Sequence, residues 1–288
     1  MIPASELIIN EDGSVFHLHL RPEQVADKLI VCGDPGRVSM IASFFDSIEC
    51  EVTSREFHTV TGTFRGKRIT ALSHGIGPDN IDIVMTELDA LKNVDFQTRE
   101  IKTRHTALQI VRIGTCGGLQ PDCPEGTALV SDWSIGFDGV LNWYAGRDSV
   151  SDPDFERALT SFIGYPKHAA DPYVVRADDE MIARFRTEDG FRHGCTVSAV
   201  GFYGPQGREV RLPLASPLLN QRLMQFEYQG HRITNYEMES AALAGMARLL
   251  GHKAVTVCLV IANRVAKRSN TGYKGGMHDL VPQVLERL

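Results

Sequence analysis

Arginines beside glycine-rich segments are the residues in this sequence that could bind an anion. Gly33-Asp-Pro-Gly-Arg37 follows an apolar run and precedes a helical pattern, so backbone N–H groups and the Arg37 guanidinium could face one anion. Arg112 stands before a second such segment, Gly114–Gly118, in which Thr115 offers a hydroxyl group. Each match alone is typical of a structural turn. An arginine buried at a strand end needs an anionic partner, however, and open α/β sheets bind ligands at the carboxyl ends of strands, so together the motifs predict a phosphate pocket.

Two further motifs carry groups that could hold a nucleoside. The loop from Phe202 to Arg208 combines an aromatic ring, the Gln206 amide and a guanidinium, which match the edge of a base that bears carbonyls and an N–H. The alternative is a polar turn without a ligand. Glu237 and Glu239 open a predicted helix, and carboxylates at this spacing can accept hydrogen bonds from a vicinal diol such as that of ribose. Their alternative role is to complement the helix dipole, an effect of about 0.3–1 kcal/mol each.

Two polar segments near the N-terminus are less informative. Val15-Phe-His-Leu-His-Leu20 predicts an edge strand with His17 and His19 on one face. The pair lacks a third ligand nearby, so we predict no metal there. Arg55 and Glu56 are interpreted as a surface ion pair, worth about 0–1 kcal/mol.

The composition describes a chain able to bury a large core. Of its 288 residues, 43% are hydrophobic and 23% are charged, and no composition shift marks a linker, so we predict one domain over residues 1–288. The net charge of −6 and the scattered basic residues argue against a nucleic-acid surface. The start of the chain lacks a basic leader and no apolar run reaches the roughly 18 residues of a membrane span, so we expect a cytoplasmic protein. The six widely spaced cysteines predict buried free thiols, without zinc or disulfides.

The elements that must position these groups alternate along the chain. Apolar, β-rich runs predict strands at 28–33, 68–73, 108–114, 127–131, 195–200 and 254–261. Apolar residues at helical spacing behind Gly77-Pro78 predict one helix, and residues 236–250 predict another that ends before Gly251. The polar segment 97–106 is a helix end or an exposed loop. This is an α/β chain, and the pattern leaves open whether its sheet is doubly wound or closed.

Read in order, seven motifs of this chain resemble the uridine phosphorylase branch of the nucleoside phosphorylases, which are pentosyltransferases. They are Phe16-His-Leu18, Gly33-Asp-Pro-Gly-Arg37, Ser54-Arg-Glu-Phe57, Arg112-Ile-Gly-Thr115, Phe202-Tyr with Gln206-Gly-Arg208, Asn235-Tyr-Glu-Met-Glu-Ser240 and Val260-Ile-Ala-Asn-Arg264. The resemblance covers residues 16–264. It implies a single α/β domain with a mixed, partly closed central β-sheet surrounded by helices. It also implies a homo-oligomer built from dimers that share active sites, such as a hexamer.

The resemblance implies a role for each matching residue. Phosphate, the co-substrate, would be bound by Gly33, Arg37, Arg112 and Thr115, and by Arg55 from the neighbouring subunit. The ribose would be held by Glu237, Met238 and Glu239, and by His17 of the neighbour near the 5′-hydroxyl. The base would be bound by Phe202, Gln206, Arg208 and Arg264. No organic cofactor is implied.

The implied reaction is phosphorolysis of uridine to uracil and ribose 1-phosphate, a step of nucleoside salvage. Phosphate attacks the anomeric carbon through a transition state with oxocarbenium character. Arg112 would hold the phosphate, and the bound phosphate would stabilise the positive charge on the sugar. The departing pyrimidine gathers negative charge, so Arg208 and Gln206 would bind it better late in the reaction than early. These three residues are the catalytic candidates.

One position separates the branches of the family. Purine-cleaving relatives place an aspartate after the last strand, because a purine leaves best when its ring nitrogen is protonated. This chain has Ala262 and Asn263 there, and neither can supply a proton. A purine phosphorylase or a hydrolytic nucleosidase is the nearest alternative. A catalytically silent nucleoside-binding protein is another, although such a protein has no use for Arg37 and Arg112.

The chain departs from the family pattern at two places. Gly77-Pro-Asp-Asn80 replaces the usual Gly-Gly-Pro-Ser, which argues against the monovalent cation, K⁺ for example, that the family binds at the subunit boundary with Glu56 as the matching ligand. Gly204-Pro205 reverses the usual order of these two residues, a change that could alter the preference between uracil and thymine.

Overall fold

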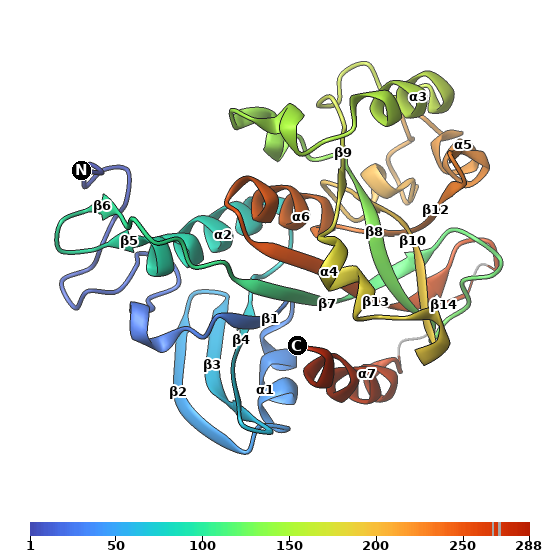
Figure 1. The fold of residues 1–288 in the computed structure, drawn as a ribbon. Helices are drawn as coiled ribbons and strands as arrows, with labels where there is room; N and C mark the ends of the chain where they lie inside the picture. Colours follow the sequence, from blue (N-terminus) through green and yellow to red (C-terminus); the bar gives the residue numbers. More distant parts are fainter. Residues whose placement is uncertain (267, 270–271) are drawn as a thin grey trace.

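A computed structural model describes residues 1–266, 268–269 and 272–288, and a mixed β-sheet forms its centre (Figure 1). The strands are β1 Lys28–Cys32, β2 Ser47–Ser54, β3 Phe57–Phe64, β4 Lys67–Ser73, β5 Val94–Asp95, β6 Glu100–Ile101, β7 Gln109–Gly118, β8 Ala128–Gly136, β9 Tyr173–Arg176, β10 Phe191–Ser198, β11 Glu227–Tyr228, β12 His231–Glu237, β13 Lys253–Asn263 and β14 Arg268–Ser269. The main sheet has the order β11-β12-β10-β8-β13-β7-β1-β4-β3-β2, with β14 beside β13 and β9 beside β8.

Part of this sheet closes into a ring. β7 pairs in parallel with β13 and antiparallel with the end of β12, where Gly118 lies opposite Asn235. β12 continues through β10 and β8 back to β13. The mixed, partly closed sheet that the resemblance implied is therefore confirmed.

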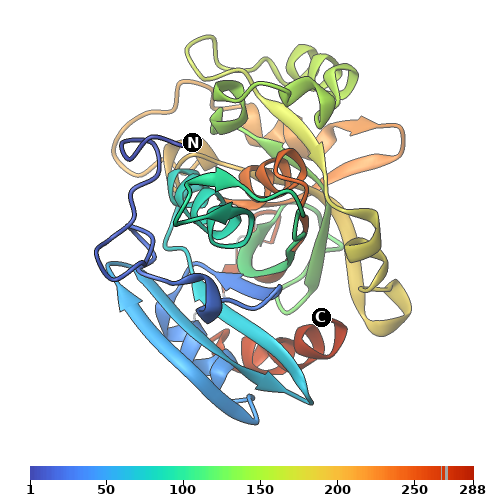
Figure 2. The same cartoon turned by 60° about the vertical axis from the view of Figure 1, so that its left-hand side comes forward.

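Helices cover both faces of the sheet (Figures 1 and 2). They are α1 Pro35–Ala42, α2 Pro78–Asn93, α3 Pro153–Ile163, α4 Asp179–Ala183, α5 Leu219–Gln225, α6 Ser240–Leu249 and α7 Lys274–Arg287. Successive residues of β1 show why both faces need cover, because side chains alternate along a strand. Ile30 and Cys32 belong to the core that includes α1 and α7, whereas Leu29 and Val31 belong to the core that includes α2 and α6.

The predicted strands are all present, although several are longer than the sequence indicated. The predicted helix behind Gly77 is α2, and it begins at Pro78. The segment 97–106 contains β6, which forms a short hairpin with β5. The six cysteines are free thiols as expected, but Cys50 is only half-buried.

Three expectations about local structure were wrong. Residues 15–20 form a turn instead of an edge strand, with the Val15 amide bonded to the Leu20 carbonyl, because Val15, Leu18 and Leu20 are all buried. The second helix starts at Ser240, so Glu237 ends β12 and Glu239 is the N-cap of α6. Arg112 lies within β7 and not at its end.

Candidate active site

The first candidate anion site lies between β1 and α1, as the sequence predicted. Asp34 caps α1 by accepting the Gly36 N–H at 2.9 Å, and Gly33 is required because a Cβ there would approach the Gly75 carbonyl oxygen to 2.9 Å. Arg37 is buried, and its guanidinium donates to the Ile113 carbonyl at 3.0 Å. Within the described residues no carboxylate forms a salt bridge with Arg37. A buried and uncompensated guanidinium favours an anionic ligand.

Arg112 is held next to this site by His74, which the sequence analysis did not identify. The Arg112 Nε donates to His74 Nε2 at 3.2 Å. Burial and the nearby charge of Arg112 hold the pKa of His74 well below its usual value, so the ring stays neutral and can accept this bond. The sequence signal that could have identified His74 is its position directly before the glycine-rich turn of residues 75–77. Thr115, three residues along β7, is half-buried.

The anionic partner that Arg112 requires is a pair of carboxylates. Its guanidinium contacts Glu237 at 2.9 Å and also contacts Glu239, and all three side chains are at least 95% buried. Burial alone would lower the pKa of Arg112, but the two carboxylates outweigh burial and raise it. Burial raises the pKa of Glu239, against the effect of Arg112. Arg112, which the sequence predicted to bind phosphate, therefore contacts the two carboxylates that the sequence predicted to bind ribose.

The two carboxylates are not equivalent, which corrects the expectation that both accept a diol. Glu237 accepts the hydroxyls of Ser198 and Ser240, the N–H groups of Glu239 and Ser240, and Arg112. This set occupies its lone pairs. Among the described residues, the donors to Glu239 are Arg112 and the Gly77 N–H, the latter at 2.8 Å. Glu239 therefore retains acceptor capacity for ribose hydroxyls, while Glu237 is an anchor. Met238 between them is half-buried.

The loop after β10 brings the predicted base-binding residues together. Arg208 donates to the Phe202 carbonyl at 2.6 Å and to the Gln206 side-chain oxygen, and its guanidinium lies 3.7 Å from the centroid of the Phe202 ring. In this conformation Arg208 covers one face of the Phe202 ring. A base that stacks on this face must therefore displace the guanidinium.

Arg264 supports the same loop from the end of β13. It donates to the Gln206 carbonyl, which also accepts the Asn220 amide of α5 at 3.1 Å. Burial and the positive charge of Arg264 lower the pKa of Arg208 to about 10, and burial also lowers the pKa of Arg264. In the described part of the chain neither arginine forms a salt bridge with a carboxylate. Two half-buried cations without a counter-charge would stabilise negative charge on a ligand.

Asn263 is fully engaged by the protein. Its amide donates to the carbonyls of Gln120 and Cys123, at 3.0 and 2.8 Å, and its side-chain oxygen accepts the N–H groups of Val265 and Ala266. The buried amide therefore has no donor left for a ring nitrogen of a purine. This finding agrees with the interpretation of Ala262 and Asn263 from the sequence.

His17 and Arg55 form a separate cluster with Phe16. The Phe16 and His17 rings lie 4.8 Å apart, and the Arg55 guanidinium lies 5.6 Å from the Phe16 centroid. Arg55 is exposed in the turn between β2 and β3 and forms no ion pair with Glu56 in the described structure, so the surface-pair interpretation was wrong. No described contact links the cluster to Arg112 or Glu239 of the same chain. Glu56 is exposed, and the start of its side chain lies against Gly75.

A mainly apolar cavity of about 710 Å³ adjoins the base loop. Arg208 and Tyr203 line it together with Leu212 and Leu219, which follow the loop, and Phe137 and Tyr165. Arg112, Glu237 and Glu239 do not line it. The cavity thus extends from the base loop away from the carboxylates.

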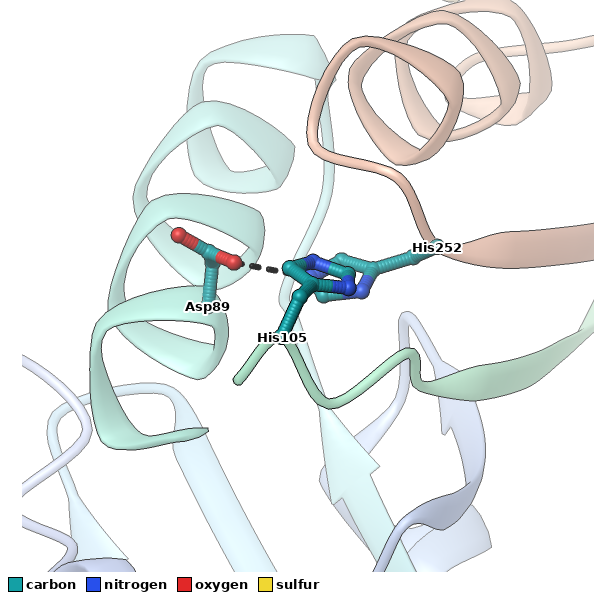
Figure 3. A group of neighbouring side chains, drawn as sticks. All are labelled: Asp89, His105 and His252. Atoms are coloured by element: carbon teal, nitrogen blue, oxygen red, sulfur yellow. Dashed lines mark ion pairs between the residues drawn. The ribbon is translucent and has the colours of Figure 1, made fainter. Parts of the chain in front are cut away.

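Asp89, His105 and His252 are the one group in the described chain with the composition of a metal site (Figure 3). The two rings stack with their centroids 5.5 Å apart and 24° between their planes, and His105 Nε2 already lies 2.9 Å from the Leu250 carbonyl oxygen. His252 Nδ1 accepts the Leu108 N–H at 3.1 Å, which leaves the proton on Nε2, 3.2 Å from Asp89. The geometry fits a clamp between α2 and the α6–β13 junction better than a metal centre.

One α/β domain thus carries a buried arginine–carboxylate cluster at β7 and β12, and two cations without a described counter-charge at the loop after β10. The chain belongs to the phosphorylase superfamily, whose family model matches residues 27–284. It is 28% identical over 261 residues to the uridine phosphorylase of Thermococcus kodakarensis, covering 88% of this chain and 79% of that one. It is 31% identical over 261 residues to the uridine phosphorylase of Escherichia coli, covering 88% and 87%.

A solved structure is similar over nearly the whole chain. It is a nucleoside phosphorylase of Trypanosoma brucei described as showing uridine phosphorylase activity, with a TM-score of 0.89, 29% identity, and coverage of 98% of this chain and 99% of that one. The family resemblance inferred from the seven motifs is confirmed. None of the described helices is long and apolar enough to cross a lipid bilayer.

Proposed function

We propose that this chain is a pentosyltransferase that cleaves uridine, or a related pyrimidine nucleoside, with phosphate to give the free base and ribose 1-phosphate. One observation carries the proposal. A buried unit, in which the Arg112 guanidinium pairs with the carboxylates of Glu237 and Glu239, adjoins the uncompensated Arg37. The base loop supplies a second uncompensated group, Arg208 with Arg264. The names of the relatives support the same reaction.

Phosphate is held by Arg37 and Arg112, with Gly33 at the turn between β1 and α1 and Thr115 on β7 beside Arg112. An oxygen of phosphate attacks the anomeric carbon of the ribose that Glu239 holds, and the bond from that carbon to the base breaks. The electron pair of this bond moves onto the pyrimidine, whose charge Arg208 and Gln206 stabilise. Water then protonates the released base.

A pyrimidine is favoured over a purine by Asn263. A purine leaving group needs a proton or a donor at its ring nitrogen, but the Asn263 amide is bonded on both sides to backbone groups. A purine phosphorylase or a hydrolytic nucleosidase ranks second to a pyrimidine phosphorylase as a candidate function.

The decisive experiment is release of free base from a panel of uridine, thymidine, deoxyuridine and inosine, with and without phosphate. We expect phosphate-dependent release from the pyrimidine nucleosides. Release that ignores phosphate would exclude a phosphorylase, and a preference for inosine would exclude the pyrimidine assignment. Binding of nucleosides without any turnover would identify a non-catalytic binding protein.

We further propose that the active site is shared between subunits of a dimer-based oligomer. Arg55 and His17 form an exposed cluster without described contacts to Arg112 or Glu239 in their own chain, which supports their entry into a neighbouring site. Mixing Arg55→Ala subunits with Arg208→Ala subunits should restore part of the activity, because some sites then hold both arginines. Verified mixed oligomers without any recovery would contradict shared sites.

A cytosolic location and the absence of an organic cofactor stay predictions. So does the loss of the family's K⁺ site at Glu56, which the departure at Gly77-Pro-Asp-Asn80 indicates. Dialysis against K⁺-free buffer followed by activity measurement with and without added K⁺ tests the last of them.

A further inference from the structure

Glu87 is a buried carboxylate of α2 that contacts the turn carrying His17. It accepts the backbone N–H of His17 at 3.0 Å and that of Leu18 at 2.9 Å. It also lies 2.6 Å from the His17 ring nitrogen Nδ1. The Glu87 side chain is 9% exposed, whereas that of His17 is 31% exposed. One carboxylate therefore fixes both the backbone and the ring of His17.

The contacts determine which ring nitrogen of His17 carries its proton. A carboxylate accepts hydrogen bonds and does not donate them, so Nδ1 must be the protonated nitrogen. In the neutral ring, Nε2 then carries a lone pair and can only accept. No described residue hydrogen-bonds to Nε2, and the ring is partly exposed beside Phe16 and Arg55. The cluster thus presents a directed acceptor at the surface.

We propose that Glu87 is a positioning residue that holds His17 in the Nδ1–H form, so that Nε2 accepts the 5′-hydroxyl proton of a nucleoside bound in the neighbouring subunit. This inference rests on the proposed function and on its shared site. It adds a residue that does not touch the substrate, and it states the direction of the hydrogen bond.

The direction of this bond has a consequence for substrate choice. A 5′-hydroxyl has a proton to donate, whereas a 5′-deoxynucleoside has none at that position. A 5′-phosphate presents negatively charged oxygens, which the Nε2 lone pair repels. The Glu87–His17 pair therefore selects nucleosides over both 5′-deoxynucleosides and nucleotides.

The kinetic test compares kcat/KM for uridine and 5′-deoxyuridine in the full-length protein. Loss of one hydrogen bond is expected to change this ratio about 3- to 10-fold. His17→Ala should remove the preference for uridine. Glu87→Gln should remove it to a similar extent, because an amide has only one acceptor oxygen. Its NH₂ group can instead donate to Nδ1, which moves the ring proton to Nε2. The double variant should lose no more than either single variant.

Asp82→Asn is the matched control, because Asp82 is a carboxylate on the same helix whose partner is the Tyr144 hydroxyl. The control should keep the wild-type ratio. A Glu87→Gln variant that loses activity equally on both substrates, or that keeps the wild-type ratio, would overturn the positioning role.

A second measurement does not depend on activity. Nitrogen NMR of protein labelled at histidine, with His17 assigned by its disappearance in His17→Ala, reports which ring nitrogen is protonated. We expect the Nδ1–H form in the wild type and its loss in Glu87→Gln. A wild-type ring protonated on Nε2 at neutral pH would refute the inference. If the protein released no base from any nucleoside, the proposed function and the 5′-hydroxyl contact would fail together, while this spectrum would still decide what Glu87 does to His17.

Discussion

The sugar–phosphate half and the base half of the site are built in opposite ways. The first half consists of Arg112, Glu237 and Glu239, which lie on or beside strands of the closed ring and are at least 95% buried. In it, one guanidinium forms salt bridges with two carboxylates. Arg208 and Gln206 lie on a loop whose aromatic residues are exposed, and the positive charge of Arg208 has no described counter-charge. Under the proposed function, the first half would bind phosphate and the ribose hydroxyls, which are present from the start. The second half would stabilise charge that appears only as the bond to the base breaks.

The largest effect should come from removing the central cation of the buried half. Arg112→Met leaves two buried carboxylates without a counter-charge, which typically costs about 3–5 kcal/mol. We expect that loss in the free energy of unfolding by urea, together with loss of activity. Arg37→Met is the matched control, because Arg37 forms no salt bridge with a carboxylate among the described residues. This variant should lose phosphate-dependent activity with a smaller loss of stability. Equal destabilisation by both changes would contradict the contrast between paired and unpaired arginines.

In the base half, Arg208→Ala should affect turnover and not stability. Removing one donor to developing charge typically lowers kcat about 10²- to 10³-fold, and a loop change is expected to alter the unfolding free energy by less than about 0.5 kcal/mol. The KM for phosphate should stay near the wild-type value. Arg211→Ala, three residues further along the same exposed segment, provides the control and should retain activity. A parallel rise in the KM for phosphate would mean that the two halves are not separate.

The two carboxylates should differ from each other. Glu239→Gln weakens acceptors that are free to bind the ribose diol, so kcat/KM for uridine should fall about 10-fold relative to that for 2′,3′-dideoxyuridine. Glu237→Gln should lower both values alike and reduce stability, since its lone pairs already bond to protein donors. The same substrate ratio in both variants would argue against the anchor role of Glu237.

The smallest effect concerns the clamp that ties α2 to the α6–β13 junction behind the buried half. Burial raises the pKa of Asp89, but the hydrogen bonds from His252 and Asn93 outweigh burial, and the net shift is downward. A lowered pKa in the folded state contributes stability above the unfolded value of about 3.9, and this contribution is lost as pH falls through the folded pKa. Asp89→Asn should therefore cost about 1 kcal/mol at pH 5–7. The difference between the variant and the wild type in the free energy of unfolding by urea should disappear at lower pH. A difference that stays constant with pH would exclude a stabilising role of the ionised Asp89 carboxylate.

Most of the architecture could be predicted from the sequence, because alternating apolar runs and Gly-Pro helix starts are local signals. Closure of the ring could not, since it depends on pairing between the ends of β7 and β12, which no local pattern records. For the same reason Arg112 was placed at a strand end, although glycines at Gly114 and Gly117 continue the strand.

The candidate site was predicted in its residue types but not in all of its geometry. The motifs identified Arg37, Arg112, Glu239 and Arg208, because each stands in a short, ordered pattern. Glu87 was missed, although a carboxylate within the apolar face of Val84, Leu88 and Leu91 signals a buried partner. That partner, His17, is 70 residues away in the chain, so only the structure could identify it.

The ring of strands also determines when the active site can form. β7 ends at Gly118, yet one of its edges pairs along its length with β13, which ends at Asn263. The end of its opposite edge pairs with β12, which ends at Glu237. During synthesis, a ribosome must therefore release nearly the entire polypeptide before both edges of β7 are covered. Such late pairing is slow and leaves an apolar strand edge open to association with other nascent chains, so expression of this protein should depend strongly on chaperones.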